Sequence, residues 1–170
     1  LENPAAEFDP AEFIGLLRRL NARLYSIASS LKAFPDQAHL TVATVRYESR
    51  GRRRGGVCST FLADQVTETT PLPTFIKPSA GFRLPHPGEE TPIIMCGPGT
   101  GIAPFRAFCQ ERRATDARGD AWLFFGEINR ATCFFYEEEW QSYLADGTLR
   151  RADTAFSRDQ AQKLYVQHKM

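Results

Sequence analysis

The sequence Pro92-Ile93-Ile94-Met95-Cys96-Gly97-Pro98-Gly99-Thr100-Gly101-Ile102-Ala103-Pro104-Phe105 decides how the rest of the chain is interpreted. Apolar residues run into three glycines at alternate positions, and Pro104 follows where an amphipathic pattern starts. This order predicts a strand, a tight loop and a helix. Glycine permits positive φ and leaves backbone amides open to a phosphate, and a helix N-terminus attracts anions. The candidate residues of a phosphate-binding loop are therefore Gly97, Gly99, Thr100 and Gly101.

Two common phosphate motifs do not fit this loop. Its third glycine comes one residue earlier than in G-x-G-x-x-G, and no Gly-Lys-Ser/Thr follows as in a Walker loop. The alternative interpretation is a glycine-rich turn between a strand and a helix that holds no ligand.

The composition is that of an ordinary globular protein. The chain has 170 residues, is 42% hydrophobic and 24% charged, and carries a net charge of +1, so nothing global indicates nucleic acid or an anionic membrane as a partner. No apolar run approaches the roughly 20 residues that span a bilayer, and residues 1–10 lack a signal-peptide pattern. We therefore expect a cytoplasmic protein. Its four cysteines form no C-x-x-C pair, so no metal site is expected.

The sequence of the first half of the chain is typical of short β-strands that are interrupted by prolines. After a frayed entry over residues 1–10, spaced apolar residues predict a helix from Pro10 with Asp9 as its N-cap. Residues 24–30 and 39–47 predict strands. A short helix is expected from Val57.

The arginine-rich run of residues 50–56 lies between the second predicted strand and that helix. We interpret it as a solvated loop rather than a nucleic-acid site, because no aromatic residues are interleaved with its charges. Residues 71–88 contain five prolines and predict short barrel-like strands, followed by a boundary near residues 88–91.

The second half alternates strands and helices. Helices are predicted over 105–114 and 136–144, and strands over 121–126 and 149–156, with a loop and a helix beginning in 157–170. The strand over 121–126 is continuously apolar, as in a parallel sheet buried on both faces. This alternation is typical of a doubly wound sheet.

A second candidate site follows the last predicted strand. Ligands bind outside the carboxyl ends of parallel strands, so this position shares an edge with the glycine loop. An arginine fork, a lysine and two hydroxyls suit an additional phosphate, which suggests a 2′-phosphorylated dinucleotide. The alternative is an exposed basic helix start. The residues concerned are Ser157, Arg158, Lys163 and Tyr165.

A third candidate site combines Arg23, Tyr25 and Ser26 with Gly56. A guanidinium beside an aromatic ring can hold a pyrophosphate and stack a flat heterocycle, and Gly56 before a short helix supplies another anion site. An ordinary core or surface tyrosine is the alternative for Tyr25.

Five motifs in order resemble the FAD/NADP(H) module of the diflavin reductases, most closely that of NADPH-sulfite reductase flavoproteins. The likeness extends from about Leu20 to Met170. The motifs are Arg23-Leu24-Tyr25-Ser26-Ile27-Ala28-Ser29-Ser30, Gly56-Val57-Cys58-Ser59, the loop from Gly97 to Arg106, Leu123-Phe124-Phe125-Gly126, and Ala155-Phe156-Ser157-Arg158-Asp159-Gln160 with Tyr165-Val166-Gln167.

The resemblance implies a partial antiparallel FAD-binding β-barrel followed by a truncated, doubly wound NADP-binding parallel sheet. Residues 1–20 resemble the tail of a helical connecting region, 21–90 part of the barrel and 91–170 the NADP(H)-binding domain. The implied chemistry is hydride transfer from NADPH to FAD, after which electrons pass singly to an FMN domain and on to a haem/iron-sulfur acceptor subunit.

The resemblance also assigns residues to the two cofactors. Ser26 matches the residue beside the reactive flavin N5 and is the one catalytic candidate. The positions that match FAD contacts are Arg23, Leu24, Tyr25, Ser26, Thr41, Val42, Ala43, Tyr47, Gly56, Val57, Cys58 and Ser59. The positions that match contacts to NADPH are Ser157, Arg158, Lys163, Leu164, Tyr165, Val166 and Gln167.

The chain also departs from the family pattern. The family continues past Met170 with a Cys-Gly-Asp segment and a C-terminal aromatic, and an FMN domain precedes the module, so we expect a fragment or a shortened relative. Related sequences tend to carry an acidic residue where Cys133 stands. Two alternatives stay open: a nucleotide-binding or subunit-docking domain without turnover of its own, and the same module from an enzyme like NADPH-cytochrome reductase.

Overall fold

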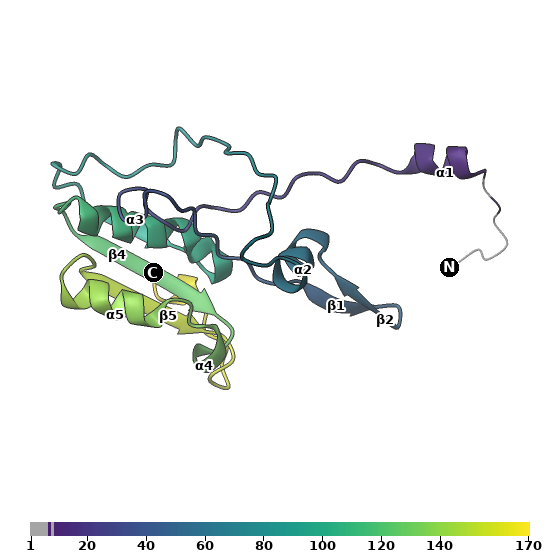
Figure 1. Cartoon of the computed structure of the whole chain (residues 1–170). Coiled ribbons are helices and arrows are strands. Elements are labelled where there is room, and N and C mark those ends of the chain that lie inside the picture. Colours follow the sequence, from purple (N-terminus) through teal and green to yellow (C-terminus); the bar gives the residue numbers. More distant parts are fainter. Residues whose placement is uncertain (1–6, 8) are drawn as a thin grey trace.

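The computed structural model describes residue 7 and residues 9–170 (Figure 1). Within that part of the chain the helices are α1 (Pro10–Leu16), α2 (Val57–Asp64), α3 (Ala103–Ala114), α4 (Arg130–Cys133) and α5 (Glu137–Ala145), with 3₁₀ turns η1 (Gly99–Ile102) and η2 (Val166–His168). The strands are β1 (Arg46–Ser49), β2 (Arg52–Gly55), β3 (Ile93–Cys96), β4 (Ala121–Glu127) and β5 (Arg151–Phe156).

A parallel sheet of order β3-β4-β5 forms the body of the second half. Ile93 pairs with Ala121 at one end of the β3–β4 ladder, and Glu127 pairs with Phe156 at the end of the β4–β5 ladder. Both ladders run in the same direction, so the carboxyl ends of all three strands meet at one edge of the sheet. The predicted parallel sheet is confirmed.

The core alternates across β4, because successive side chains of a strand point to opposite faces. Leu123 and Phe125 join a buried cluster with Trp140 of α5 and Cys109 of α3, and Phe124 joins a smaller cluster with Val166 on the other face. Figure 1 shows α3 and α5 flanking β4. The prediction that this strand is buried on both faces is confirmed.

The glycine loop and the helices of the second half follow the predicted pattern. β3 runs into η1 and then into α3, with Pro104 in the first turn. The helix predicted over 136–144 is α5, which starts one residue later because Tyr136 is its N-cap with a left-handed backbone. Of the loop and helix predicted to begin within 157–170, the described chain forms the loop and the short 3₁₀ turn η2, but no α-helix.

The first half is less regular than the sequence suggests. In place of the strand predicted over 24–30, one isolated antiparallel bridge joins Ile27 to Leu40. The second predicted strand, 39–47, is reduced to β1, which begins only at Arg46 and forms a hairpin with β2. The arginine run is therefore the turn and the second strand of this hairpin rather than a loop, while its exposure to solvent agrees with our expectation. The predicted helices are confirmed as α2 and as α1, whose N-cap Asp9 accepts bonds from two backbone amides.

Residues 66–92 contain no helix or strand, so the short strands predicted over 71–88 are wrong. The prolines of this segment remove donors that a ladder would need. The antiparallel sheet of the described chain has two strands, β1 and β2, and does not close into a barrel. The predicted frayed entry lies largely in residues 1–6 and 8, outside the described residues. Among the described residues no helix is long and apolar enough to cross a bilayer.

Candidate functional site

A hollow of about 450 Å³ lies at the carboxyl edge of the parallel sheet. Its walls come from the glycine loop, the ends of β4 and β5, and the segment that contains η2. The lining residues are Pro98, Gly99, Gly126, Glu127, Ile128, Ala155, Ser157, Leu164, Tyr165, Val166 and Gln167. This is the edge at which parallel α/β sheets bind ligands.

Glycine is required at specific points around this hollow. Gly99 has φ +56°, a backbone conformation that residues other than glycine rarely adopt. A Cβ on Gly97 would lie 2.7 Å from the carbonyl oxygen of Gly101, so only glycine lets the loop fold back this tightly. The amides of Gly97 and Gly101 donate to the carbonyls of Phe124 and Pro98, both at 3.0 Å. No side chain caps the start of η1 in the described structure, so the amides at that start are the ones open to an anion.

The structure brings most of the predicted nucleotide residues to this hollow. Those that line it are Gly99, Ser157, Leu164, Tyr165, Val166 and Gln167. The predicted residues outside its lining are Gly97, Thr100, Gly101, Arg158 and Lys163. Arg158 and Lys163 have exposed side chains in the same segment.

Backbone bonds fix the start of this segment beside β4. The amide of Ser157 donates to the carbonyl of Glu127 at 2.8 Å, and the amide of Arg158 donates to the carbonyl of Ile128 at 2.9 Å. Asp159 accepts from the Asn129 side chain and from the Arg130 amide, both at 2.9 Å. These bonds hold the pKa of Asp159 below its usual value. The predicted 2′-phosphate residues therefore stand on a loop that is tied at three successive positions.

The residues predicted to bind the flavin nucleotide lie partly together. The side chains of Tyr25 and Cys58 are hydrogen-bonded, and this bond raises the pKa of the Tyr25 phenol, with burial as a smaller cause. Positions that are 33 residues apart in sequence are thus adjacent in space. The structure therefore connects the first and second motifs, as one cofactor site requires.

The start of α2 is built around Gly56. Its amide donates to the Val45 carbonyl at 2.9 Å, and the buried Ser59 hydroxyl accepts from the Val45 amide at 3.1 Å. A Cβ on Gly56 would lie 2.8 Å from the Ser59 oxygen. No side chain caps this helix start in the described structure, so its first amides are free for a phosphate.

Other predicted flavin residues are more dispersed. Arg23 is exposed and donates to the carbonyl of Asn21. Ser26, the catalytic candidate, is exposed, and Tyr47 is 56% exposed on β1. Thr41 instead meets the second half of the chain, because its hydroxyl lies 2.7 Å from the Tyr136 hydroxyl.

Comparison with known proteins agrees with this division of sites. Residues 2–61 match a family model described as an FAD binding domain, and residues 89–170 match an oxidoreductase NAD-binding domain. The sulfite reductase [NADPH] flavoprotein alpha-component of Bacillus subtilis (strain 168) is 54% identical over 159 residues, which cover 94% of this chain and 26% of that protein. The chain is therefore similar to sulfite reductase flavoprotein alpha-components over nearly all of its own length.

Other relatives with the same name agree. The alpha-component of Klebsiella pneumoniae is 54% identical and that of Escherichia coli (strain K12) 52% identical, each over 165 residues that cover 97% of this chain and 27% of the relative. The chain thus spans about a quarter of the length of the curated relatives that it matches.

The structure adds residues that the sequence did not single out as site residues. Gly126, Glu127 and Ile128 line the hollow at the end of β4. Their position directly after a buried strand was a usable signal, since the same argument located Ser157. Gly126 is also sterically required, because a Cβ there would lie 2.3 Å from Cγ2 of Val166. Cys133 is partly buried at the end of α4, outside the lining of the hollow.

Proposed function

We propose that this chain is an oxidoreductase module that receives a hydride from NADPH onto FAD and passes electrons onward. The observation that carries the proposal is the hollow at the carboxyl edge of β4 and β5, where the glycine loop meets Ser157, Tyr165 and Gln167. A loop in which a Cβ on Gly97 would collide with the backbone, beside a segment of hydroxyl and basic side chains, fits a phosphorylated dinucleotide.

The chain's own residues would bind and orient the two nucleotides. The amides around Gly99 and Thr100 would hold a pyrophosphate, and Ser157, Arg158 and Lys163 a 2′-phosphate. Tyr25 would offer its ring to the flavin while its hydroxyl is held by Cys58, and the uncapped start of α2 would hold the flavin phosphates. When bound, FAD supplies the hydride-accepting chemistry.

Other parts of the proposal come from the relatives. The matched proteins are flavoprotein components of a sulfite reductase, so we propose a haem-containing acceptor subunit as the partner, reached through an FMN domain. We propose residues 21–90 as the FAD-binding part and 91–170 as the NADP(H)-binding part, with residues 1–20 as the tail of a connecting region. The cytoplasmic location stays part of this proposal.

Replacement of Arg158 by Ala tests the nucleotide assignment. Loss of a charge-assisted contact to the 2′-phosphate should weaken NADP⁺ binding by about 2 to 3 kcal/mol and leave NAD⁺ binding nearly unchanged. Isothermal titration of both nucleotides measures this difference. Arg150→Ala is a matched control, since Arg150 is exposed at the opposite end of β5. Equal losses for both nucleotides would show that Arg158 does not read the 2′-phosphate.

A visible absorption spectrum tests the hydride transfer. The chain is incubated with FAD, free flavin is removed, and NADPH is added. Retained flavin that bleaches supports the proposed module. Retained flavin or bound nucleotide without bleaching supports instead the second candidate, a nucleotide-binding or subunit-docking domain without turnover, which the open two-stranded sheet of the described chain favours.

A further inference from the structure

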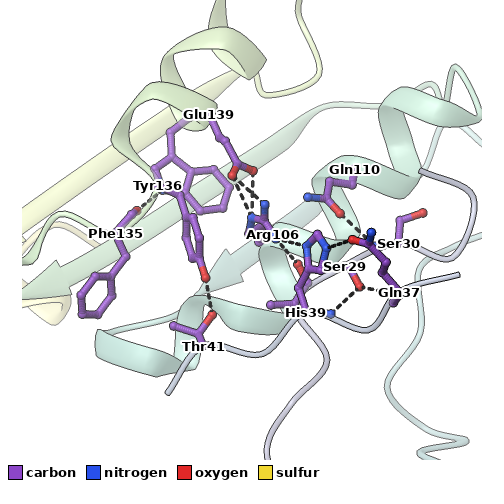
Figure 2. A network of polar contacts seen from close by, with 12 residues as sticks. Ser29, Ser30, Gln37, His39, Thr41, Arg106, Gln110, Phe135, Tyr136 and Glu139 are labelled. Atoms are coloured by element: carbon purple, nitrogen blue, oxygen red, sulfur yellow. Dashed lines mark hydrogen bonds and ion pairs between the residues drawn. The ribbon is translucent and has the colours of Figure 1, made fainter. Parts of the chain in front are cut away.

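A cluster centred on Arg106 joins the two halves of the chain, and neither the sequence motifs nor the proposed cofactor contacts account for it (Figure 2). Arg106 lies on α3, and its side chain is only 11% exposed. Two sides of its guanidinium contact different halves of the molecule. We call Arg106, Glu139 and Tyr136 together with Ala28, His39 and Thr41 the anchor cluster.

On one side Arg106 is held by α5. Its Nε donates to both carboxylate oxygens of Glu139 at 3.0 and 2.9 Å, and its Nη2 donates to Oε1 at 2.7 Å. The Tyr136 ring covers the guanidinium, with the central carbon 4.6 Å from the ring centroid. A fork held at three contacts and covered by a ring has one orientation, which is the property that separates arginine from lysine.

On the other side Arg106 contacts the first half of the chain. Its Nη1 donates to the carbonyl of Ala28 at 2.9 Å and lies 3.1 Å from Nδ1 of His39. Because arginine can only donate, Nδ1 must be the acceptor, and the proton of the neutral ring sits on Nε2, which lies 2.8 Å from Oε1 of Gln37. The Ala28 amide also donates to the His39 carbonyl at 2.7 Å. One guanidinium thus contacts both segments that the Ile27–Leu40 bridge joins.

Tyr136 makes a second connection across the same boundary. Its φ is +62°, an unfavourable conformation for a tyrosine that persists only where the surroundings hold it. This backbone places the phenol 2.7 Å from the Thr41 hydroxyl. Figure 2 shows Tyr136 extending from its helix toward Thr41 while Arg106 extends toward His39.

The residues that contact Arg106 in the first half of the chain lie next to the predicted flavin residues. Ala28 lies two positions after the predicted flavin residues 23–26, and His39 lies two positions before the predicted flavin residues 41–43. Arg106 itself follows the last glycine of the nucleotide loop by five residues on the helix that the loop starts. The anchor cluster therefore joins both flavin segments to the nucleotide loop through side chains rather than through the intervening chain.

We propose that Arg106 is a positioning residue, which fixes the flavin-facing segments against the nucleotide-facing loop and so sets the distance across which the hydride moves. The roles of flavin and hydride in this inference rest on the proposed function. The docking of residues 28–41 onto α3 stands independently of it. Hydride transfer needs reacting atoms within about 3.5 Å, and a displacement of about 1 Å costs on the order of a hundredfold in rate.

Hydrogen exchange measured by mass spectrometry on the full chain without ligands is the first test. Arg106→Ala should raise exchange in peptides covering Ala28, Ser30 and His39 by roughly tenfold to a hundredfold, the range for lost charge-assisted bonds. Peptides of β4 should keep their protection. Arg106→Lys should fail to restore protection, because one ammonium cannot replace the fork; restoration by lysine would show that charge alone matters and would overturn the proposal.

Arg113→Ala is the matched control. Arg113 lies on the same helix, forms an ion pair with Asp146, donates to the Ser142 hydroxyl at 2.8 Å and covers the Tyr143 ring. It therefore joins α3 to the α5 region in the same way but none of these contacts reaches residues 28–41. Unchanged exchange in those peptides for Arg106→Ala, or an equal rise for Arg113→Ala, overturns the proposal.

If the Arg106→Ala variant also loses protection in β4, it has unfolded, and Tyr136→Phe is then the test of the anchor cluster. It removes only the hydroxyl that meets Thr41 and should raise exchange in the peptide covering residues 40–43; no rise would overturn the proposal.

With FAD and NADPH added, Arg106→Ala should slow flavin bleaching at saturating NADPH by about tenfold to a hundredfold, with the half-saturating NADPH concentration unchanged. A loss explained entirely by weaker half-saturation overturns the positioning role. Failure of the wild-type chain to bind FAD contradicts the proposed function, while the exchange result still decides the anchor cluster.

Discussion

Replacement of Gly126 by alanine should destabilise the parallel-sheet half through one identifiable collision. The new Cβ would lie 2.3 Å from Cγ2 of Val166, whereas its next neighbours, the Ala155 carbonyl and Pro98, lie at 3.5 and 3.7 Å. Val166 is 8% exposed and packs with Phe124 and Ala155, so it cannot move into solvent without loss of burial. Forcing one carbon into such a site costs about 1 to 3 kcal/mol.

A second substitution isolates this contact. Val166→Ala removes both methyl groups of the side chain, including the colliding Cγ2, and by itself should cost about 1.5 to 3 kcal/mol of lost burial. In the double variant the collision no longer exists, so the loss should fall short of the sum of the single losses by about 1 kcal/mol or more. Gly101→Ala is the control, because its Cβ would meet only Pro98, at 3.9 Å. It should change stability by less than about 0.5 kcal/mol.

Urea unfolding followed by tryptophan fluorescence measures these changes. The chain has two tryptophans, Trp122 on β4 and Trp140 on α5, so the signal reports on the parallel-sheet half alone. Additive losses for Gly126→Ala and Val166→Ala would refute the argument that Val166 is the reason for glycine. Because Val166 lies in the predicted NADPH segment, Gly126→Ala should also weaken NADP⁺ binding.

Three further outcomes are expected. Burial raises the pKa of the Cys109 thiol to about 12, so iodoacetamide at pH 8 should alkylate the exposed Cys96 and leave Cys109 unmodified until denaturant is added, as peptide mass spectrometry would show. The pKa of Asp159 is lowered by its bonds from Asn129 and Arg130, so their contribution is complete above the ordinary carboxyl range near pH 4 and is lost as the pH falls through the lowered value. Acid should therefore lower the protection of the Arg130 amide, measured relative to its intrinsic exchange rate at each pH, and Asp159→Asn should abolish that transition. Tyr25→Phe removes the bond to Cys58 but keeps the ring, so FAD affinity measured by flavin fluorescence should fall by less than about tenfold, and Tyr25→Ala should cost more.

Some residues of the candidate site could be predicted from short local sequence patterns, and others could not. The glycine loop and the residues after β5 could be located from sequence, since each directly follows a strand with a clear apolar pattern. The meeting of Tyr25 with Cys58 followed only from family resemblance, because two isolated residues 33 positions apart leave no periodic signal. Arg106 was visible in the sequence as part of a motif, yet its partners Ala28 and Glu139 lie 78 and 33 residues away.

The sequence by itself determined the half of the molecule in which burial is strong and regular. β4 is buried along nearly its whole length, and α3 carries an apolar stripe, so hydrophobic periodicity specifies both elements before any contact is known. Tertiary structure decided the rest. β1 and β2 are exposed at every position and show no alternation that would identify them, so an arginine run forms a strand only because its neighbour supplies the ladder. The docking of residues 28–41 onto α3 likewise depends on a buried guanidinium whose partners come together only in the folded chain.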